Sequence, residues 1–157
     1  MVSRFKAATP DIEVRRRALD LLARREHSAQ ELQQKLRARG FDHQTITDVV
    51  RGLTAEGLLS DERFVEAFID SRVNKGYGPL RIRSELQERG IGEALIARHL
   101  DEAERDWPAR IEAVRRKRFG AGLPEEYKAQ AQQMRFLQYR GFGGEQIRAL
   151  FRQKDRD

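Results

Sequence analysis

Three histidines are the side chains best suited to metal binding or proton transfer. His27 stands beside an expected helix boundary, His43 lies in an expected first turn, and His99 takes an apolar position of its helix. None has a partner at metal-binding spacing on the same helix face. The chain also lacks cysteine, which excludes a thiolate zinc site, a thiol nucleophile and a disulfide framework. We therefore expect no metal site.

Two pairs of adjacent carboxylates, Asp61-Glu62 and Glu125-Glu126, have side chains that could perform acid–base work. Both pairs are expected in the first turn of a helix, where negative charge interacts favourably with the helix dipole. No glycine-rich phosphate loop follows a predicted strand, and Gly76-Tyr77-Gly78 is expected as a turn between helices. The sequence therefore predicts no catalytic residue and no cofactor, with an enzyme that uses Asp or Glu as a remaining alternative.

Basic side chains are concentrated toward both ends of the chain and around one tyrosine in the middle. Of the total charge of +6, residues 1–60 carry +3, residues 61–107 carry −3 and residues 108–157 carry +6. Basic ends favour an anionic partner, and such binding is weakened by salt. The candidate contact residues are Arg16, Arg24, Arg25, Arg72, Lys75, Tyr77, Arg81, Arg83, Arg115, Arg116, Lys117, Arg118 and Arg140.

Each basic cluster also has a purely structural interpretation. Consecutive arginines point in successive directions around a helix, so at least one of each run is ordinary solvated surface. The Tyr77 ring could stack on a base or on an aromatic surface of a partner. Alternatively, Arg81, Glu85 and Arg89 form a ladder at i, i+4 spacing that braces their helix.

A repeat of about fifty residues positions these side chains. Apolar residues and one glycine recur with the same spacing in a second copy, and more faintly in a third. Leu32, Leu36, Gly40, Ile46 and Val50 correspond to Ile82, Leu86, Gly90, Ile96 and Leu100, and Leu137, Gly141, Ile147 and Phe151 continue the series. The sequence therefore predicts three similar repeats.

Start and stop signals divide each copy into three helices. Thr9-Pro10 opens the first helix, and Ser28 with Glu31 forms a capping box. Asp42 is expected to cap the third helix, and glycines such as Gly40 to end helices in the left-handed conformation. Ser60 or Asp61 begins the second copy.

These signals predict an all-α fold of three tandem three-helix repeats. We expect a tail over 1–11 and repeats over 12–59, 60–107 and 108–157. A unit this small buries too little apolar surface to be stable alone, so the copies should pack on their neighbours in an elongated array, straight or curved.

The composition predicts a cytoplasmic protein. No signal peptide is visible over Met1 to Asp11, and no run of about 18 apolar residues occurs. No helix has a second broad apolar face, so we expect a monomer.

The central part of the chain resembles the RecX family of recombination regulators. The resemblance covers roughly residues 12–153. It is carried by Asp61-Glu62-Arg63-Phe64-Val65, Phe68-Ile69, Arg72, Gly76-Tyr77-Gly78, Arg81-Ile82, Glu85-Leu86 and Arg89-Gly90-Ile91, with Ser28, Glu31-Leu32, Lys35-Leu36 and Gly40-Phe41 in the first copy and Arg135-Phe136-Leu137 and Arg140-Gly141-Phe142 in the third. It implies the fold of three tandem three-helix repeats, and neither a cofactor nor a catalytic residue.

The resemblance further implies a modulator of the SOS response and DNA repair that binds RecA. It would lie in the groove of the RecA–DNA filament, block filament growth, and so inhibit strand exchange, ATP hydrolysis and coprotease activity. The alternative is a helical DNA-binding protein that acts independently of RecA, through its helix-turn-helix-like pairs and terminal arginines.

Overall fold

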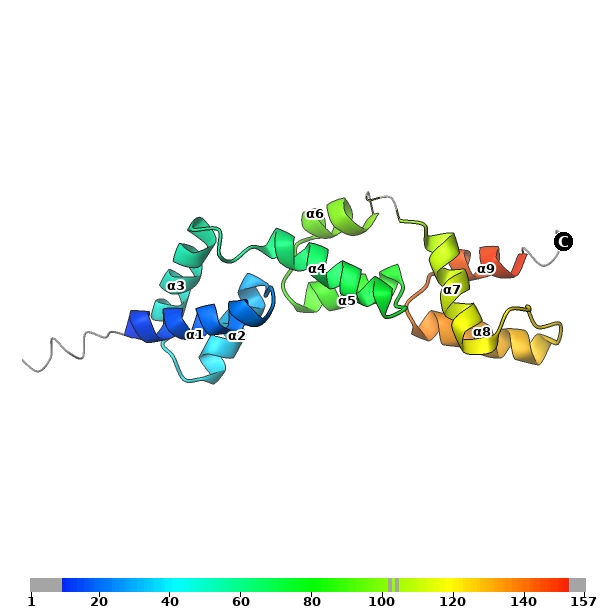
Figure 1. Ribbon diagram of the computed structural model, residues 1–157, viewed down its shortest axis with the longest axis horizontal. Helices are drawn as coiled ribbons and strands as arrows, with labels where there is room; N and C mark the ends of the chain where they lie inside the picture. Colours follow the sequence, from blue (N-terminus) through cyan, green and yellow to red (C-terminus); the bar gives the residue numbers. More distant parts are fainter. Residues whose placement is uncertain (1–9, 102, 104, 153–157) are drawn as a thin grey trace, which may run out of the picture. The chain divides into compact units, whose positions relative to one another are not determined.

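In the part of the chain that the structure describes, all regular secondary structure is helical. The structure is a computed structural model and describes residues 10–101, 103 and 105–152 (Figure 1). Its elements are α1 (Pro10–Arg24), α2 (Ala29–Ala38), α3 (His43–Ala55), α4 (Asp61–Asn74), α5 (Pro79–Glu88), α6 (Glu93–Ile96) continued by a π-helical turn (Ala97–Asp101), α7 (Trp107–Phe119), α8 (Tyr127–Tyr139) and α9 (Gly144–Arg152). No strand occurs in these described ranges, and none of their helices is both long and apolar enough to cross a membrane. The all-α prediction is confirmed.

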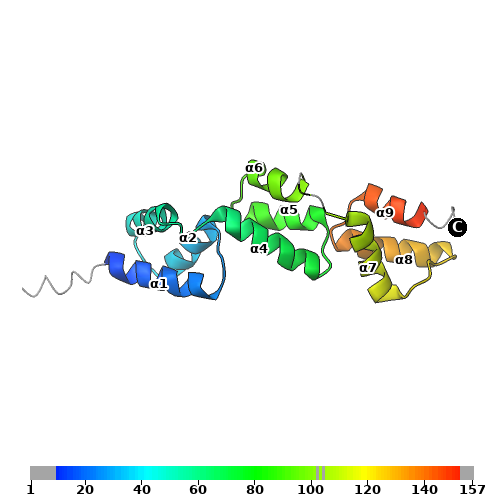
Figure 2. The same cartoon turned by 45° about the horizontal axis from the view of Figure 1, so that its top comes forward.

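The helices follow one another in groups of three, as the fifty-residue repeat predicts. Figure 2 shows α1, α2 and α3 packed together, and α7, α8 and α9 packed together in the same way. The first group begins at Pro10, while Thr9, its expected start signal, lies outside the described residues. The expected tail over 1–11 also lies outside them up to residue 9, and Pro10 and Asp11 already belong to α1.

Side-chain caps begin the helices where the sequence indicates. Ser28 Oγ accepts the backbone N–H of Glu31 at 3.0 Å, and Glu31 Oε1 accepts the backbone N–H of Ser28 at 3.3 Å, which completes the capping box. Asp42 Oδ2 accepts the backbone N–H of Thr45 at 3.2 Å, and Ser60 Oγ caps α4 in the same way. Because each cap satisfies N–H groups that the helix cannot, these residues fix where α2, α3 and α4 start.

One expected helix start is wrong. Asp61-Glu62 does lie in the first turn of α4, but Glu125-Glu126 precedes α8. Glu126 is the N-cap of α8, and its side chain makes no capping hydrogen bond. Gly120 has a φ of 92°, and the loop that begins there extends through Glu125 and Glu126. These two carboxylates therefore precede α8 and do not lie in its first turn.

The chain divides into two compact units. Unit 1 comprises residues 1–67 with 87–95, and unit 2 comprises residues 68–86 with 96–157, in each case where the structure describes them. Both units bury apolar side chains at repeat positions. The core of unit 1 contains Val14, Ala18, Leu32, Leu36, Ile46, Val50, Leu53 and Leu59. The core of unit 2 contains Ile111, Leu137, Phe142, Ile147, Leu150 and Phe151, with Trp107 packed edge-on against Phe142 at 6.2 Å.

Within unit 1, the start of α2 packs against the turn that follows α5. Ser28 Oγ donates to the carbonyl of Arg89 at 2.8 Å, and Gln30 Nε2 donates to the carbonyl of Glu88 at 3.2 Å. Gly90, with a φ of 80°, lies beside the Gln30 side chain with no room for a Cβ atom. This turn therefore requires glycine for its conformation and also for its packing.

Within unit 2, the start of α5 packs against the turn that follows α8 in an equivalent way. Gly78 donates its backbone N–H to the carbonyl of Arg140 at 2.8 Å, and Leu80 donates to the carbonyl of Gly141 at 2.9 Å. Gly141, with a φ of 99°, approaches the backbone of Arg81 so closely that a Cβ atom would lie 2.8 Å from its nitrogen. Because Ser28 and Gly78 are fifty residues apart, the repeat extends from the helices to the junctions between them.

Candidate functional site

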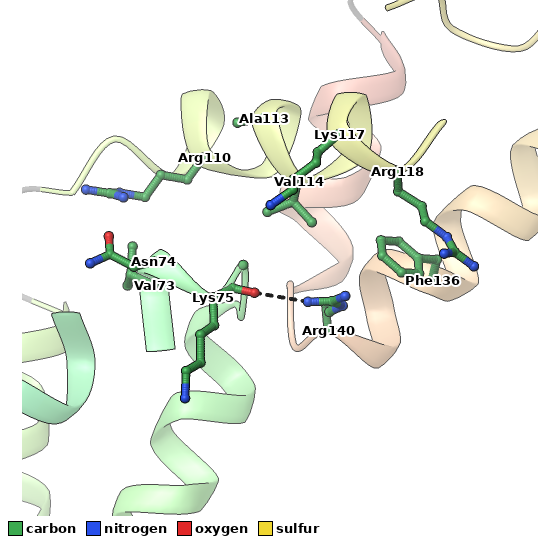
Figure 3. Close-up of a pocket in the computed structure, with 11 residues that line it drawn as sticks. Val73, Asn74, Lys75, Arg110, Ala113, Val114, Lys117, Arg118, Phe136 and Arg140 are labelled. Carbon is green, nitrogen blue, oxygen red and sulfur yellow. Dashed lines mark hydrogen bonds between the residues drawn. The ribbon is translucent and has the colours of Figure 1, made fainter. Parts of the chain in front are cut away.

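A cavity of about 470 Å³ opens in unit 2 among the end of α4, the helix α7 and the C-terminal half of α8 (Figure 3). Val73, Val114 and Phe136 form part of its wall. Its polar lining is almost entirely cationic and comes from all three elements: Lys75 follows α4, Arg110, Lys117 and Arg118 belong to α7, and Arg140 follows α8. We refer to these five side chains as the cation cluster.

In the part of the chain that the structure describes, the cation cluster has no compensating negative charge. No acidic residue is among the described residues that line the cavity. Within residues 10–101, 103 and 105–152, no carboxylate forms an ion pair with any of the five side chains. Like charges held together around a partly enclosed cavity raise its positive potential, because low-dielectric walls focus the field. The site is therefore suited to an anion.

Arg140 is held in place at the edge of this cavity. Its Nη1 donates to the carbonyl of Lys75 at 3.1 Å, the bond drawn in Figure 3. Its guanidinium lies 5.0 Å from the ring centroid of Phe136 and 5.4 Å from that of Tyr77, and the guanidinium of Arg118 lies 5.6 Å from Phe136. These cation–π contacts orient two of the five charges in the absence of a ligand.

The turn after α4 closes tightly against the other two helices. Gly76 has a φ of 88°, and a Cβ atom there would lie 3.3 Å from Val114 and 3.4 Å from Arg140. Glycine supplies the left-handed conformation without a steric penalty and also lets the turn approach α7. The local sequence therefore positions Lys75 relative to the α7 cations.

Four predicted contact residues come together in this cavity: Lys75, Lys117, Arg118 and Arg140. The sequence interpretation missed Arg110, which lines the same wall. A signal for it was present, because Arg110, Val114 and Lys117 are spaced at i, i+4 and i+7 and so share one helix face.

Two other predicted contacts, Arg72 and Arg81, are ion-paired with one carboxylate. Arg72 Nε donates to Glu85 at 2.6 Å, and Arg81 Nε donates to the same carboxylate at 3.3 Å. Burial raises the pKa of Glu85, but the hydrogen bonds from Arg72 and Arg81 outweigh burial, so its pKa is lowered overall. The bracing interpretation of Arg81 and Glu85 is confirmed.

Tyr77 is less available than the sequence suggests. The guanidinium of Arg81 lies over its ring at 3.9 Å, and that of Arg140 lies 5.4 Å from the same centroid. A base that stacked on Tyr77 would have to displace a cation–π contact.

Of the remaining predicted contacts, Arg25 directly follows α1, and Arg16, Arg24, Arg83 and Arg116 lie on helices. Arg25 pairs with Glu31 at 2.9 Å, Arg116 pairs with Glu112 at 3.0 Å, and Arg83 pairs with Asp101. Arg16 and Arg24 are exposed on α1 and form no ion pair within the described ranges. Exposed pairs contribute about 0–1 kcal/mol, so they can exchange for a partner's charge at little cost.

Arg115 must be withdrawn from the contact residues, because its side chain is only 1% exposed. Its guanidinium donates to the carbonyls of Gly120 at 3.1 Å, Ala121 at 2.9 Å and Gly122 at 3.2 Å, and to Gln133 Oε1 at 3.3 Å. A run of four consecutive basic residues covers every direction around a helix, so one of them faces inward. Arg115 organises the loop after α7.

His27 is also a structural residue. It is 1% exposed, its Nδ1 lies 3.1 Å from the carbonyl of Arg25, and its Nε2 lies 2.9 Å from Lys35 Nζ. An ammonium group can only donate, so this contact is satisfied when Nε2 accepts and Nδ1 carries the proton. The geometry therefore favours the neutral imidazole, and burial lowers the pKa of His27 in the same sense.

Fold and site together define an all-helical, tandem-repeat protein with a cavity in unit 2 that is suited to an anion. Three family models cover most of the chain: the first, second and third three-helix domains of RecX match residues 15–51, 60–100 and 104–151. The chain belongs to the RecX family of regulatory proteins.

Named relatives and solved structures agree with this assignment. The regulatory protein RecX of Halorhodospira halophila (strain DSM 244 / SL1) is 48% identical over 144 residues, which cover 92% of this chain and 89% of the relative. That of Pseudomonas entomophila (strain L48) is also 48% identical, over 92% of this chain and 93% of the relative. The crystal structure of RecX from Lactobacillus salivarius matches with a TM-score of 0.75 at 18% identity, over 96% of this chain and 99% of that chain. At that identity the structural match supports the fold alone.

Proposed function

We propose that this protein is a negative regulator of homologous recombination and DNA repair that binds RecA and the RecA–single-stranded DNA filament. It blocks filament extension and thereby inhibits strand exchange, ATP hydrolysis and coprotease activity. The observation that carries the proposal is the match to all three RecX domains in order along the chain. It acts by binding, as a monomer in the cytoplasm, without a cofactor or a catalytic step.

The proposed contacts begin with the cations that form no ion pair among residues 10–101, 103 and 105–152. These are the cation cluster of unit 2 and, in unit 1, Arg16 and Arg24 on α1. A filament of protein and nucleic acid offers repeated phosphates and carboxylates, so several weak charge-assisted contacts on one molecule add through effective concentration. Contacts of this kind make inhibition decrease as salt increases.

The test is a titration of RecA ATPase activity on single-stranded DNA with this protein. We expect inhibition at less than one molecule per RecA protomer, because a blocked filament end stops many later additions. The double variant Arg110→Glu/Lys117→Glu should inhibit at least tenfold less. The matched control is Lys128→Glu/Arg135→Glu, which reverses two exposed charges of α8 that do not line the cavity.

The alternative is a DNA-binding protein that acts without RecA, and the same unpaired cations favour it. Mobility shifts on bare single- and double-stranded DNA across a salt series separate the two functions. Equal affinity for bare DNA and for RecA filaments at physiological salt, with RecA ATPase unchanged, would support the alternative and contradict the proposal.

A further inference from the structure

The cation cluster carries more positive charge than the few phosphates of a nucleic-acid strand that the cavity could hold would need for neutralisation. Five cationic side chains line a single cavity of about 470 Å³. This volume lies within the range of small-ligand sites, which is roughly 300–1,000 Å³. A nucleic-acid strand carries about one charge per 3.4 Å of its length, so a cavity of this size would enclose only a few singly charged phosphates. A condensed phosphate chain, which places several charges on adjacent phosphate groups, matches the cluster more closely.

Among the described residues that line the cavity, Phe136 is the one aromatic side chain. The guanidinium groups of Arg118 and Arg140 lie over its ring, 5.6 and 5.0 Å from the centroid. A base that stacked on Phe136 would compete with these two cation–π contacts, whereas a phosphate chain would leave them in place.

The backbone that carries the cluster is held in place by contacts between its helices. The bond from Arg140 Nη1 to the carbonyl of Lys75 ties the end of α8 to the end of α4. The close approach of Gly76 to Val114 holds α7 against the same turn. Because these backbone positions are fixed, a ligand loses less free energy in ordering the site. The side chains of Lys75, Arg110 and Lys117, in contrast, are free of ion pairs within the described residues and can turn toward a ligand.

We infer that this cavity binds a condensed phosphate chain, either that of a nucleoside triphosphate or a free inorganic one such as tripolyphosphate. The phosphate groups contact Lys75, Arg110, Lys117, Arg118 and Arg140, and the base of a nucleotide is left outside. This inference goes beyond the proposed function and does not rest on it, because the binding requires only this protein and the phosphate compound.

The test is isothermal titration calorimetry of the full chain with tripolyphosphate, ATP, GTP and a short oligothymidylate. We expect one saturable site for tripolyphosphate, with ATP and GTP binding within about threefold of each other, since the base is not read. The variant Arg110→Gln/Lys117→Gln should weaken all three by at least tenfold. Binding of the nucleotides together with failure of tripolyphosphate to compete would assign the affinity to the base and overturn the inference.

Two controls separate this site from diffuse attraction to a basic protein. Lys128→Gln/Arg135→Gln removes the same charge from α8 outside the cavity and should leave affinity within about twofold. The single variant Lys75→Gln probes the opposite wall and should also weaken binding. Equal losses in the control and cavity variants would overturn the inference, as would tight binding of oligothymidylate that tripolyphosphate does not displace. Thermal unfolding of each variant checks that the chain remains folded, and RecA is absent throughout, so a failure here is distinct from a failure of the proposed function.

Discussion

Gly78 donates its backbone N–H to the carbonyl of Arg140 at 2.8 Å, and no side chain fits between these two backbones. A Cβ atom on Gly78 would lie 2.5 Å from the carbonyl carbon and oxygen of Gly141. The equivalent position in unit 1 is Ser28, whose hydroxyl donates to the carbonyl of Arg89 at 2.8 Å. At this repeat position one junction thus uses a side chain and the other a direct backbone contact, so glycine is required at position 78 but not at position 28.

Replacing Gly78 by alanine should destabilise unit 2. The added methyl group must push the α5 start away from the turn after α8, and overpacking of this kind costs typically about 1–3 kcal/mol. Urea denaturation followed by circular dichroism measures the change in the free energy of unfolding. Gly122→Ala is the matched control, since nothing lies within 4 Å of a Cβ atom there. If both variants unfold at the same urea concentration as the unmodified chain, the junction does not contribute as described.

Arg115 should be the most sensitive of the four consecutive basic residues on α7. Arg115→Gln removes donors from three loop carbonyls and from Gln133 inside a site that is 1% exposed. Hydrogen bonds from a charged group contribute about 1.5–3 kcal/mol, so we expect the free energy of unfolding to fall by about that amount.

The control for this prediction is Arg116→Gln, one residue along the same helix. Arg116 is exposed and, among the described residues, forms an ion pair only with Glu112. Changes at such surface positions usually alter the free energy of unfolding by no more than about 0.5 kcal/mol. Equal stability of the Arg115→Gln and Arg116→Gln proteins in thermal and urea unfolding would show that the buried guanidinium does not hold the loop.

Arg115 and Arg110 illustrate which features of the fold and of the site can be predicted from the sequence and which cannot. Helices, caps and the fifty-residue repeat follow from local rules, and Ser28, Asp42 and Ser60 act as those rules predict. Burial of an arginine depends instead on where the chain places free carbonyls, as the loop over 120–122 does for Arg115. Helical spacing places Arg110 on the same face of α7 as Lys117, but the contact of this face with the end of α4 depends on tertiary packing, which local rules do not predict.

The stability of unit 1 should depend on pH through His27. Burial lowers the pKa of His27, and the nearby charges of Arg25 and Lys35 lower it further, against the hydrogen bond to the Arg25 carbonyl and the charge of Glu31. The unfolded chain has a histidine pKa of about 6.5. Between this pH and the lower pKa of the folded state, the unfolded chain therefore binds a proton that the folded chain does not bind. Stability is fully present above pH 6.5 and is lost as the pH falls from about 6.5 toward the lower pKa of the folded state.

The size of this effect is bounded. One proton changes the free energy of unfolding by at most about 1.4 kcal/mol per pH unit. Urea denaturation between pH 8 and 5 measures the slope, and His27→Gln should flatten it because glutamine does not titrate. A slope that is identical in the His27→Gln and unmodified proteins would assign the pH dependence to other groups. The control His43→Gln changes an exposed histidine and should keep the slope.

Removing one charge from the cation cluster should stabilise the free protein at low salt. Lys117 forms no ion pair among the described residues and faces a cavity that is lined by four other cations, so Lys117→Gln relieves repulsion without removing a bond. The midpoint of thermal unfolding should rise by a few degrees in 10 mM salt. The difference should vanish near 1 M salt, where the screening length falls to about 3 Å. Lys128→Gln, on α8 outside the cavity, should shift the midpoint less. A midpoint that falls in Lys117→Gln at low salt would mean that Lys117 makes a favourable interaction that outweighs its repulsion by the other four cations. The mutual repulsion of the five cations, on which the inferred affinity for anions depends, would then be contradicted.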